Sequence, residues 1–105
     1  MIEEVLQALS DPNRRRVLDV LREGEQPVGI LVQRVGLGQP GMSKHLRVLR
    51  EAGLVDVRKR AQQRVYALRP AALSPLDEWL QPYRALWNGS LDALQRHLDE
   101  QEGAR

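Results

Sequence analysis

Cysteine is absent from this chain of 105 residues. Without a thiol there can be no disulfide framework, no thiolate metal site and no thiol redox switch. The sequence also lacks any apolar run close to the roughly 20 residues that a membrane-spanning helix needs. Its N-terminal stretch IEEVLQALSD is acidic and amphipathic, whereas a secretory signal is basic and then apolar. We therefore expect a cytoplasmic protein that makes no membrane contact.

The residue clusters that mark catalytic sites are missing as well. The sequence has no cysteine nucleophile and no glycine-rich loop of the kind that cradles phosphate. Its one pairing of histidine with a carboxylate, His97 with Glu100, is weak. These absences favour a binding protein over an enzyme, and they indicate no cofactor.

What the sequence does contain is positive charge gathered in one window. Residues 39–64 carry 7 basic and 2 acidic side chains, a balance of +5, whereas the whole chain has a net charge of only +2. Such a concentration is expected of a surface that binds a polyanion, because each neutralised phosphate releases condensed counterions. The alternative explanation is an ordinary solvated surface.

Apolar residues at helical spacing predict four short helices in the first half of the chain, with the fourth over residues 39–52. The third and fourth helices are separated only by Gly36-Leu37-Gly38. Two short helices joined by such a turn form a helix-turn-helix, here residues 27–52, whose second helix enters the major groove of DNA. We therefore predict that the fourth helix is the recognition helix.

After the recognition helix the apolar pattern changes to a period of two. The segments LVDVRKR and RVYAL, separated by AQQ, predict a β-hairpin over residues 54–69 with basic residues near its tip. A further helix is predicted over residues 74–100. The fold class is therefore mainly α with a small β-hairpin (α+β): a winged helix-turn-helix with five helices and a two-stranded wing, in a single domain over residues 1–105.

Three segments in this order carry a resemblance to a known family. They are LSDPNRRRVLDVL, PVGILVQRVGLGQPGMSKHLRVLREAGLV and the hairpin that ends RVYAL. Together they resemble the ArsR family of bacterial winged-helix repressors, and the C-terminal segment looks like the members without metal-binding cysteines. The resemblance implies a homodimeric transcriptional repressor that binds a roughly palindromic operator in double-stranded DNA, often in its own promoter.

The candidate DNA-binding residues lie at the start of the recognition helix and on the wing. They are Gln39, Gly41, Ser43, Lys44, His45, Arg47, Arg58, Lys59, Arg60 and Arg64. On the wing we expect Arg60 and Arg64 to contribute first. Three alternatives stay open: Gln39 caps the helix, His45 hydrogen-bonds a neighbour, and Arg47 or Arg50 is solvated or pairs with Glu51.

Two positions depart from the family pattern. Gly38 stands where many relatives have serine, so the recognition helix should lack a side-chain N-cap. Ala61 stands where glycine is common on the wing, so we expect a wider hairpin turn.

The basic run Arg14-Arg15-Arg16 is interpreted as structural, because three successive helical side chains diverge by about 100° each and cannot form one site.

The C-terminal segment predicts the dimer interface, because its apolar stripe is wider than a single winged helix needs. We expect the first and last helices to pack against their two-fold mates, through Val5, Leu6, Leu9, Trp79, Tyr83, Trp87, Leu91 and Leu94. Pro82 and Asn88-Gly89 do not fit a straight helix, so we expect either a kink near Pro82 or a break at Gly89.

Two other functions compete with this interpretation. A winged helix can serve as a protein-interaction module, with the basic face bound to an acidic protein. His97 and Glu100 also resemble half of the C-terminal zinc site found in metal-responsive relatives, but the other half is missing and a closed site needs four ligands. We therefore predict no metal site. The sequence does not indicate an inducer.

Overall fold

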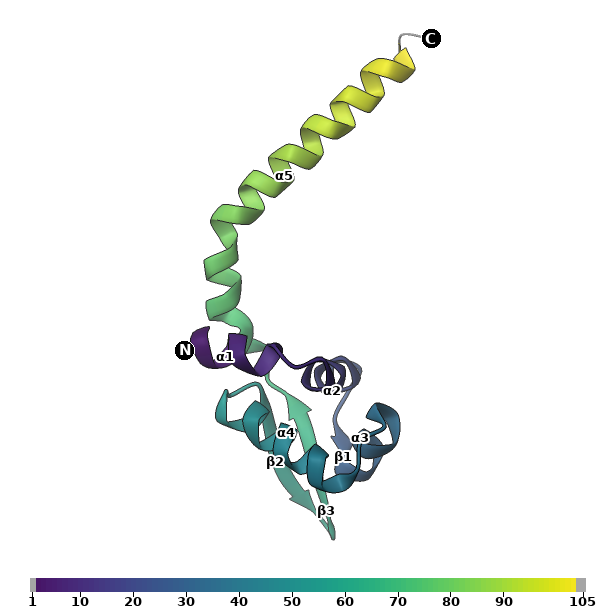
Figure 1. Cartoon of the computed structure of the whole chain (residues 1–105), viewed down its shortest axis with the longest axis vertical. Helices are drawn as coiled ribbons and strands as arrows, with labels where there is room; N and C mark the ends of the chain where they lie inside the picture. The colour runs from purple at the N-terminus through teal and green to yellow at the C-terminus, as the bar shows by residue number, and fades with distance from the viewer. Residues whose placement is uncertain (1, 104–105) are drawn as a thin grey trace.

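The computed structural model describes residues 2–103. Its elements follow one another as α1 (Ile2–Leu9), α2 (Pro12–Arg22), β1 (Gln26–Pro27), α3 (Val28–Val35), α4 (Gln39–Glu51), β2 (Val55–Arg60), β3 (Gln63–Leu68), the 3-10 helix η1 (Pro70–Leu73) and α5 (Ser74–Gly103). Helices α1 to α4 and the β-hairpin form one body, from which α5 projects (Figure 1). The predicted winged helix-turn-helix is therefore confirmed.

The core lies where α4 packs against the other helices and the sheet. Met42, Leu46 and Leu49 fall on one side of α4 at helical spacing, and each is at most 1% exposed. They join Leu31 of α3 and Leu54, which directly precedes β2, among the largest fully buried side chains. Because the inner side of α4 is fully used in the core, the polar and basic residues of this helix lie on its outer side.

The sheet has three strands and not the predicted two. Strand β3 lies in the middle, paired antiparallel with β2 on one side and with β1 on the other. The sequence pattern could not reveal β1, because two residues are too few to show a period. By pairing with β3, this short strand holds the segment before α3 against the wing.

The turn of the wing is tighter than we predicted. Arg60 pairs with Gln63, so only Ala61 and Gln62 form the loop. Ala61 has a φ of 56°, and it is the one non-glycine residue with positive φ among residues 2–103. A positive φ at the first of two loop residues is the pattern of a type II′ turn, which usually has glycine there. The prediction of a wider turn is wrong, because alanine adopts the left-handed conformation instead.

Replacing Ala61 by glycine should stabilise the protein. The left-handed conformation costs an L-residue about 1–2 kcal/mol, and the extra freedom of glycine in the unfolded chain offsets about 0.4–1 kcal/mol of that gain. We expect the free energy of unfolding of Ala61→Gly to rise by about 0.5–1 kcal/mol in urea denaturation. An equal or lower free energy of unfolding would show that the turn is not strained.

The last helix is continuous. It runs from Ser74 to Gly103 with Pro82 inside it, and Figure 1 shows it bent in its N-terminal half. The bend fits the expected kink, because proline removes a backbone hydrogen bond and clashes with the preceding turn. The other alternative, a break at Gly89, is not formed, since a single glycine costs a helix only about 1 kcal/mol. Of the helices in the described chain, none has the length and apolar character to cross a membrane.

Candidate nucleic-acid interface

The outer side of α4 begins at a turn that leaves its first residues in solvent. Helix α3 ends at Val35, its C-cap Gly36 has a left-handed φ of 83°, and α4 follows after the predicted three-residue turn. Gly38 is the N-cap and makes no side-chain cap hydrogen bond, as predicted. Gln39, Ser43 and Lys44 are all exposed on this first part of the helix. Their polar groups are therefore accessible to an external partner.

A groove separates the outer side of α4 from the wing. It has a volume of about 480 Å³ and is lined by Pro40, Ser43, Lys44, Arg47, Arg50, Arg64 and Tyr66. Four of these seven side chains are cationic and none is acidic. Within residues 2–103 the structure shows no ion pair for any of the four cations, and the considered pairing of Arg47 or Arg50 with Glu51 is not formed. We call this surface the α4 groove.

A second groove of about 520 Å³ adjoins the first at Arg64 and is rich in amides. Its lining comprises Pro27, Val28, Gly29, Ile30, Gln33, Gln39, Gln62, Gln63 and Arg64. Glutamine side chains both donate and accept hydrogen bonds, as base edges require. The alternative role of Gln39 as a helix cap is not observed, since it is the first residue of α4 and Gly38 is the cap.

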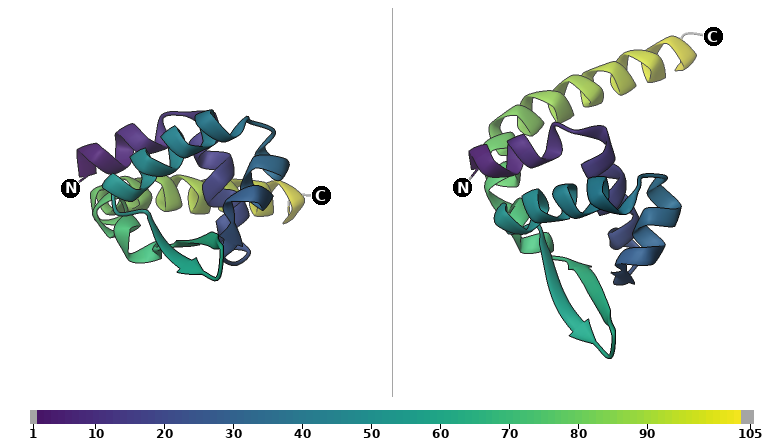
Figure 2. Two further views of the ribbon diagram at one scale, coloured as in Figure 1. Left: turned by 90° about the horizontal axis from the view of Figure 1, so that it is seen from below. Right: turned by 60° about the horizontal axis from the view of Figure 1, so that its bottom comes forward.

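The wing divides its basic residues between two faces, because side chains alternate along a strand. Lys59 lies directly opposite Arg64 in the β2–β3 register, on the face that also carries Tyr66 and contributes to the α4 groove. Arg58 and Arg60 point to the other face. The hairpin projects from the helical body on the side away from α5 (Figure 2, right). Only one of the two basic pairs therefore adjoins the recognition helix.

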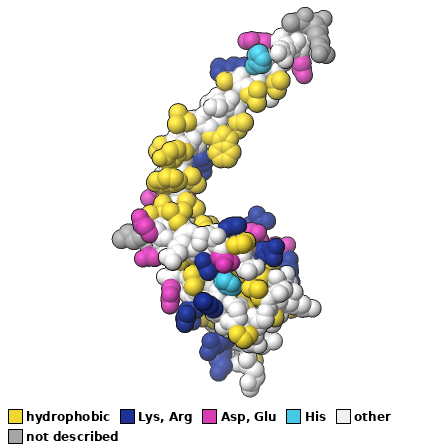
Figure 3. Space-filling model, viewed as in Figure 1, with side chains coloured by type: hydrophobic (Ala, Val, Ile, Leu, Met, Phe, Trp, Pro, Cys, Tyr) yellow, Lys and Arg dark blue, Asp and Glu magenta, His cyan; other side chains and the backbone are white. Residues whose placement is uncertain are grey.

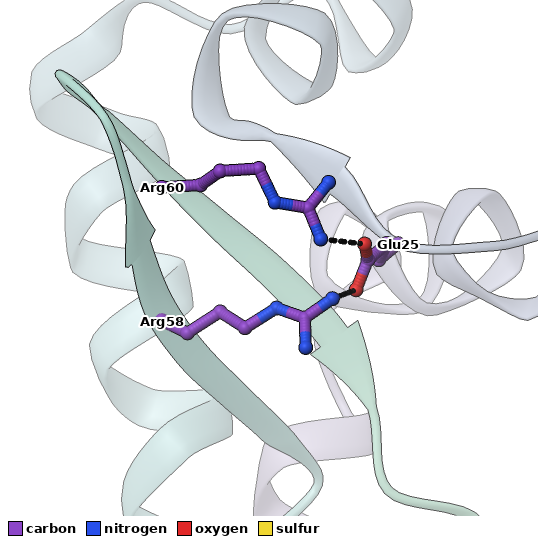
Figure 4. A network of polar contacts seen from close by, with 3 residues as sticks. All are labelled: Glu25, Arg58 and Arg60. Atoms are coloured by element: carbon purple, nitrogen blue, oxygen red, sulfur yellow. Dashed lines mark hydrogen bonds and ion pairs between the residues drawn. The ribbon is translucent and has the colours of Figure 1, made fainter.

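Arg58 and Arg60 both bind Glu25, in the loop that precedes β1 (Figure 4). Arg58 donates to Oε2 of Glu25, and Arg60 donates to Oε1 at 2.9 Å. The hydrogen bond from Arg58 is the main reason that the pKa of Glu25 is lowered. Partial desolvation opposes this shift, and the charges of both arginines reinforce it. The carboxylate is thus ionised at neutral pH.

His45 and two arginines of α2, Arg14 and Arg15, have partners within the protein. Arg14 donates from Nε to the carbonyl of Ala8 at 2.7 Å, and its Nη1 lies 3.3 Å from Nδ1 of His45. Arg15 donates to the carbonyl of Leu9 at 2.6 Å. These two arginines satisfy carbonyls at the end of α1, which supports the structural interpretation of the basic run. For His45 the structure provides the neighbour considered as an alternative.

Asp11 caps α2 beside this cluster. Its carboxylate accepts from the backbone N–H of Asn13 at 2.7 Å. Desolvation alone would raise the pKa of Asp11. The backbone hydrogen bonds and the nearby charges of His45 and Arg14 outweigh it, so the pKa is lowered. This network connects α1, the start of α2 and the recognition helix.

The projecting helix α5 carries a long apolar stripe in solvent. No side chain of α5 is buried within the described chain. The large exposed apolar side chains are Leu6 of α1 and, on α5, Trp79, Tyr83, Leu86, Trp87, Leu91, Leu94 and Leu98. Figure 3 shows apolar atoms running along the projecting helix, whereas most of the basic residues visible in this view lie on the rest of the molecule. We call this surface the α5 stripe.

The predicted interface residues of α1 differ in their exposure. Leu6 is 45% exposed and, like the side chains of the α5 stripe, is accessible to a partner chain. Val5 is only 2% exposed because it packs in the core of its own chain, and Leu9 packs partly against the same core. Val5 therefore cannot offer surface to a partner chain, and its assignment to the interface is corrected.

Metal ligands are not gathered in the described chain. Residues 2–103 contain no group of three or more His, Cys, Asp or Glu side chains placed to hold a metal ion. His97 lies 3.2 Å from the amide nitrogen of Gln101, one helical turn away. The alternative of a metal-responsive protein therefore gains no support from geometry.

Sequence reasoning missed two polar contacts around the candidate interface: Glu25 with the wing, and Arg14 with His45. Each joins residues more than 30 positions apart. No local pattern reports such a contact.

Comparisons with known proteins agree with this architecture. A family model described as a helix-turn-helix domain matches residues 9–58. The biofilm growth-associated repressor of Xylella fastidiosa is 41% identical over 75 residues, which are 71% of this chain and 66% of the relative, so the match spans just under two thirds of that protein. An HTH-type transcriptional regulator of Mycobacterium tuberculosis is 34% identical over 90% of this chain and 86% of its own length.

Solved structures share the fold over most of their length. An ArsR family transcriptional regulator superposes with a TM-score of 0.74 at 29% identity, covering 83% of this chain and 96% of its own. The transcriptional repressor BigR from Xylella fastidiosa gives a TM-score of 0.64 at 39% identity, covering 78% and 84%. With its helix-turn-helix, its wing and these relatives, the chain belongs to the ArsR family of winged helix-turn-helix transcriptional regulators.

Proposed function

We propose that this protein is a sequence-specific DNA-binding repressor that acts as a homodimer on a palindromic operator, including one in its own promoter. The observation that carries the proposal is the α4 groove, where four cations converge without an acidic side chain in the lining. Uncompensated cations in a groove attract phosphate, because binding releases counterions from the DNA. The proposed activity is binding and repression, with no catalytic step.

In this proposal the start of α4 enters the major groove. Gln39 and Ser43 hydrogen-bond base edges, and Lys44, Arg47 and Arg50 bind phosphates. Gly41 supports this orientation, because it is exposed and an added Cβ would meet nothing within 4 Å. Packing inside the chain therefore does not require glycine there, whereas close approach of a DNA backbone would.

The wing extends the same surface. Arg64 lines the α4 groove, Lys59 lies opposite it on the same face of the wing, and neither has an ion pair within residues 2–103. A hairpin in this position can contact phosphates beside the major groove or enter the neighbouring minor groove. Base readout by α4 and phosphate binding by the wing would then fix the register of one protomer on one half-site.

The α5 stripe supports the homodimer. Seven large apolar side chains lie exposed along one helix, more than a soluble monomer usually leaves in water. Pairing α5 with its two-fold mate, flanked by Leu6 of α1, would cover them. The stripe lies at the opposite end of the molecule from the wing, so a dimer formed there leaves both recognition helices free (Figures 1 and 3). Two-fold symmetry of the protein predicts a palindromic operator.

The proposal is tested by fluorescence binding with two duplexes, one from the region upstream of the protein's own gene and one scrambled. Duplexes selected by the protein from a random pool cover the case of a distant operator. We expect at least a 1000-fold preference for the operator and a steep loss of affinity with added salt. If no duplex binds even at low salt, the proposal fails, and a protein partner for the α4 groove becomes the better explanation.

A further inference from the structure

Glu25 brings one negative charge onto the basic wing. Its two carboxylate oxygens bind two different arginines, Arg58 and Arg60, which extend from β2 across β3 (Figure 4). Glu25 itself is held in place, because the next two residues form β1, which pairs with β3. The contact is therefore positioned by the sheet. We call these three residues the wing clamp.

The wing clamp is poorly suited to stabilising the fold. The side chains of Arg58 and Arg60 are 60% and 64% exposed, and exposed ion pairs contribute little to the free energy of unfolding. The pairing of β1 with β3 already joins the same two segments. What the clamp does change is the charge that the wing presents to solvent, since one carboxylate occupies both guanidinium groups.

The clamped and unclamped cations of the wing lie on different faces. Arg64 lines the α4 groove, with Lys59 directly opposite it on β3's partner strand, and neither has an acidic partner in the described residues. Phosphates that approach Arg58 or Arg60 must displace Glu25, whereas those that approach Arg64 displace only water and counterions. If Glu25 did not bind Arg58 and Arg60, all four cations of the wing would attract DNA of any sequence.

We propose that Glu25 withholds Arg58 and Arg60 from DNA and thereby limits sequence-independent binding, so that it determines specificity without touching a base. The inference rests on the proposed DNA-binding function. Non-specific affinity is almost entirely electrostatic, whereas operator affinity also includes base contacts. Releasing two arginines should therefore raise binding to a scrambled duplex more than binding to the operator, and the ratio of the two affinities should fall.

The test compares Glu25→Gln with Glu23→Gln as a matched control. Glu23 is two residues away and pairs with Arg34 of α3, so its replacement removes the same charge and releases an arginine outside the wing. For Glu25→Gln we expect affinity for a scrambled duplex to rise about 10-fold at 0.1 M salt. The slope of log K against log salt should steepen by about 1–2, close to 0.9 for each new phosphate contact. Glu23→Gln should stay within about 2-fold of the wild type.

A third variant shows whether the gain passes through the arginines. In Glu25→Gln/Arg58→Ala/Arg60→Ala the rise in non-specific affinity and salt slope should disappear. The inference is overturned if Glu25→Gln matches Glu23→Gln, if it binds the scrambled duplex more weakly than the wild type, or if the triple variant keeps the gain. Failure of the proposed function looks different, since the wild-type protein itself would then bind no duplex.

Discussion

Replacing Lys44 and Arg64 together by alanine should lower affinity for the operator by about 30- to 100-fold, because in the proposed complex both side chains bind phosphates from opposite walls of the α4 groove. Each lost phosphate contact also removes about 0.9 from the salt slope, so the slope should fall by about 1.8. Both side chains lie outside the hydrophobic core, and the fold should be unaffected. Binding titrations at four or five salt concentrations measure both quantities.

The control for this variant removes the same charge elsewhere. Arg22 and Arg34 are exposed near the ends of α2 and α3 and do not line the α4 groove. We expect Arg22→Ala/Arg34→Ala to weaken operator binding by less than about 3-fold, because distant exposed charges are screened by salt. Equal losses in the two double variants would mean that only net charge matters and that the α4 groove is not the DNA-binding surface.

Placing glutamate at Trp87 and Leu91 should separate the dimer. Full burial of each large apolar side chain is worth about 1.5–3 kcal/mol, and a symmetric interface contains two copies of each. The substitutions also place like charges face to face. We expect the dimer dissociation constant of Trp87→Glu/Leu91→Glu to rise by more than about 1000-fold, which sedimentation velocity measures. Operator affinity should fall by at least about 100-fold, since one protomer reads only one half-site.

This second variant should remain folded, because Trp87 is 63% and Leu91 51% exposed in the single chain. Its circular dichroism should match that of the wild-type protein at concentrations where both are monomeric. Ala85→Glu/Gly89→Glu is the matched control, since these residues lie about 200° around α5 from Trp87 on either side. If the control dissociates as readily as the stripe variant, or if neither does, the α5 stripe is not the dimer interface.

Periodicity alone located most of the fold. The inward row of Met42, Leu46 and Leu49 placed the recognition helix correctly, and the change to a period of two at Leu54 located the wing. These signals work because burial on one face forces a regular pattern. Strand β1 and helix η1 escaped prediction, because elements of two and four residues are too short to show one.

At three positions the sequence pattern alone did not give the observed structure. Val5 has the spacing of an interface residue, but the core of its own chain covers it. Of the two alternatives for the last helix, the break at Gly89 is not formed, because the local cost of one glycine is small. Ala61 accepts a left-handed conformation that the pairing of β2 with β3 imposes. Only the burial of Val5 depends on contacts distant in sequence, whereas the outcomes at Gly89 and Ala61 are local.

The sequence also predicted one part of the candidate site and missed another. The charge of residues 39–64 predicted a basic surface, and the structure places four of its cations around one groove. The sequence could not show that Arg58 and Arg60 bind Glu25, or that His45 lies beside Arg14, because side-chain partners depend on the packed fold. Of the two wing arginines favoured from sequence, Arg64 lines the α4 groove and Arg60 is held in the wing clamp.

The most direct test of the central claim is a hydroxyl-radical footprint of the protein on its selected duplex, with the number of bound chains counted in the same sample. We expect two chains per duplex and two protected segments related by two-fold symmetry, with centres about one helical turn or slightly more apart. Protection should weaken at the outer edges in Lys44→Ala/Arg64→Ala. One chain per duplex, or uniform protection with no symmetric pair of segments, would contradict a dimer that reads two half-sites through α4.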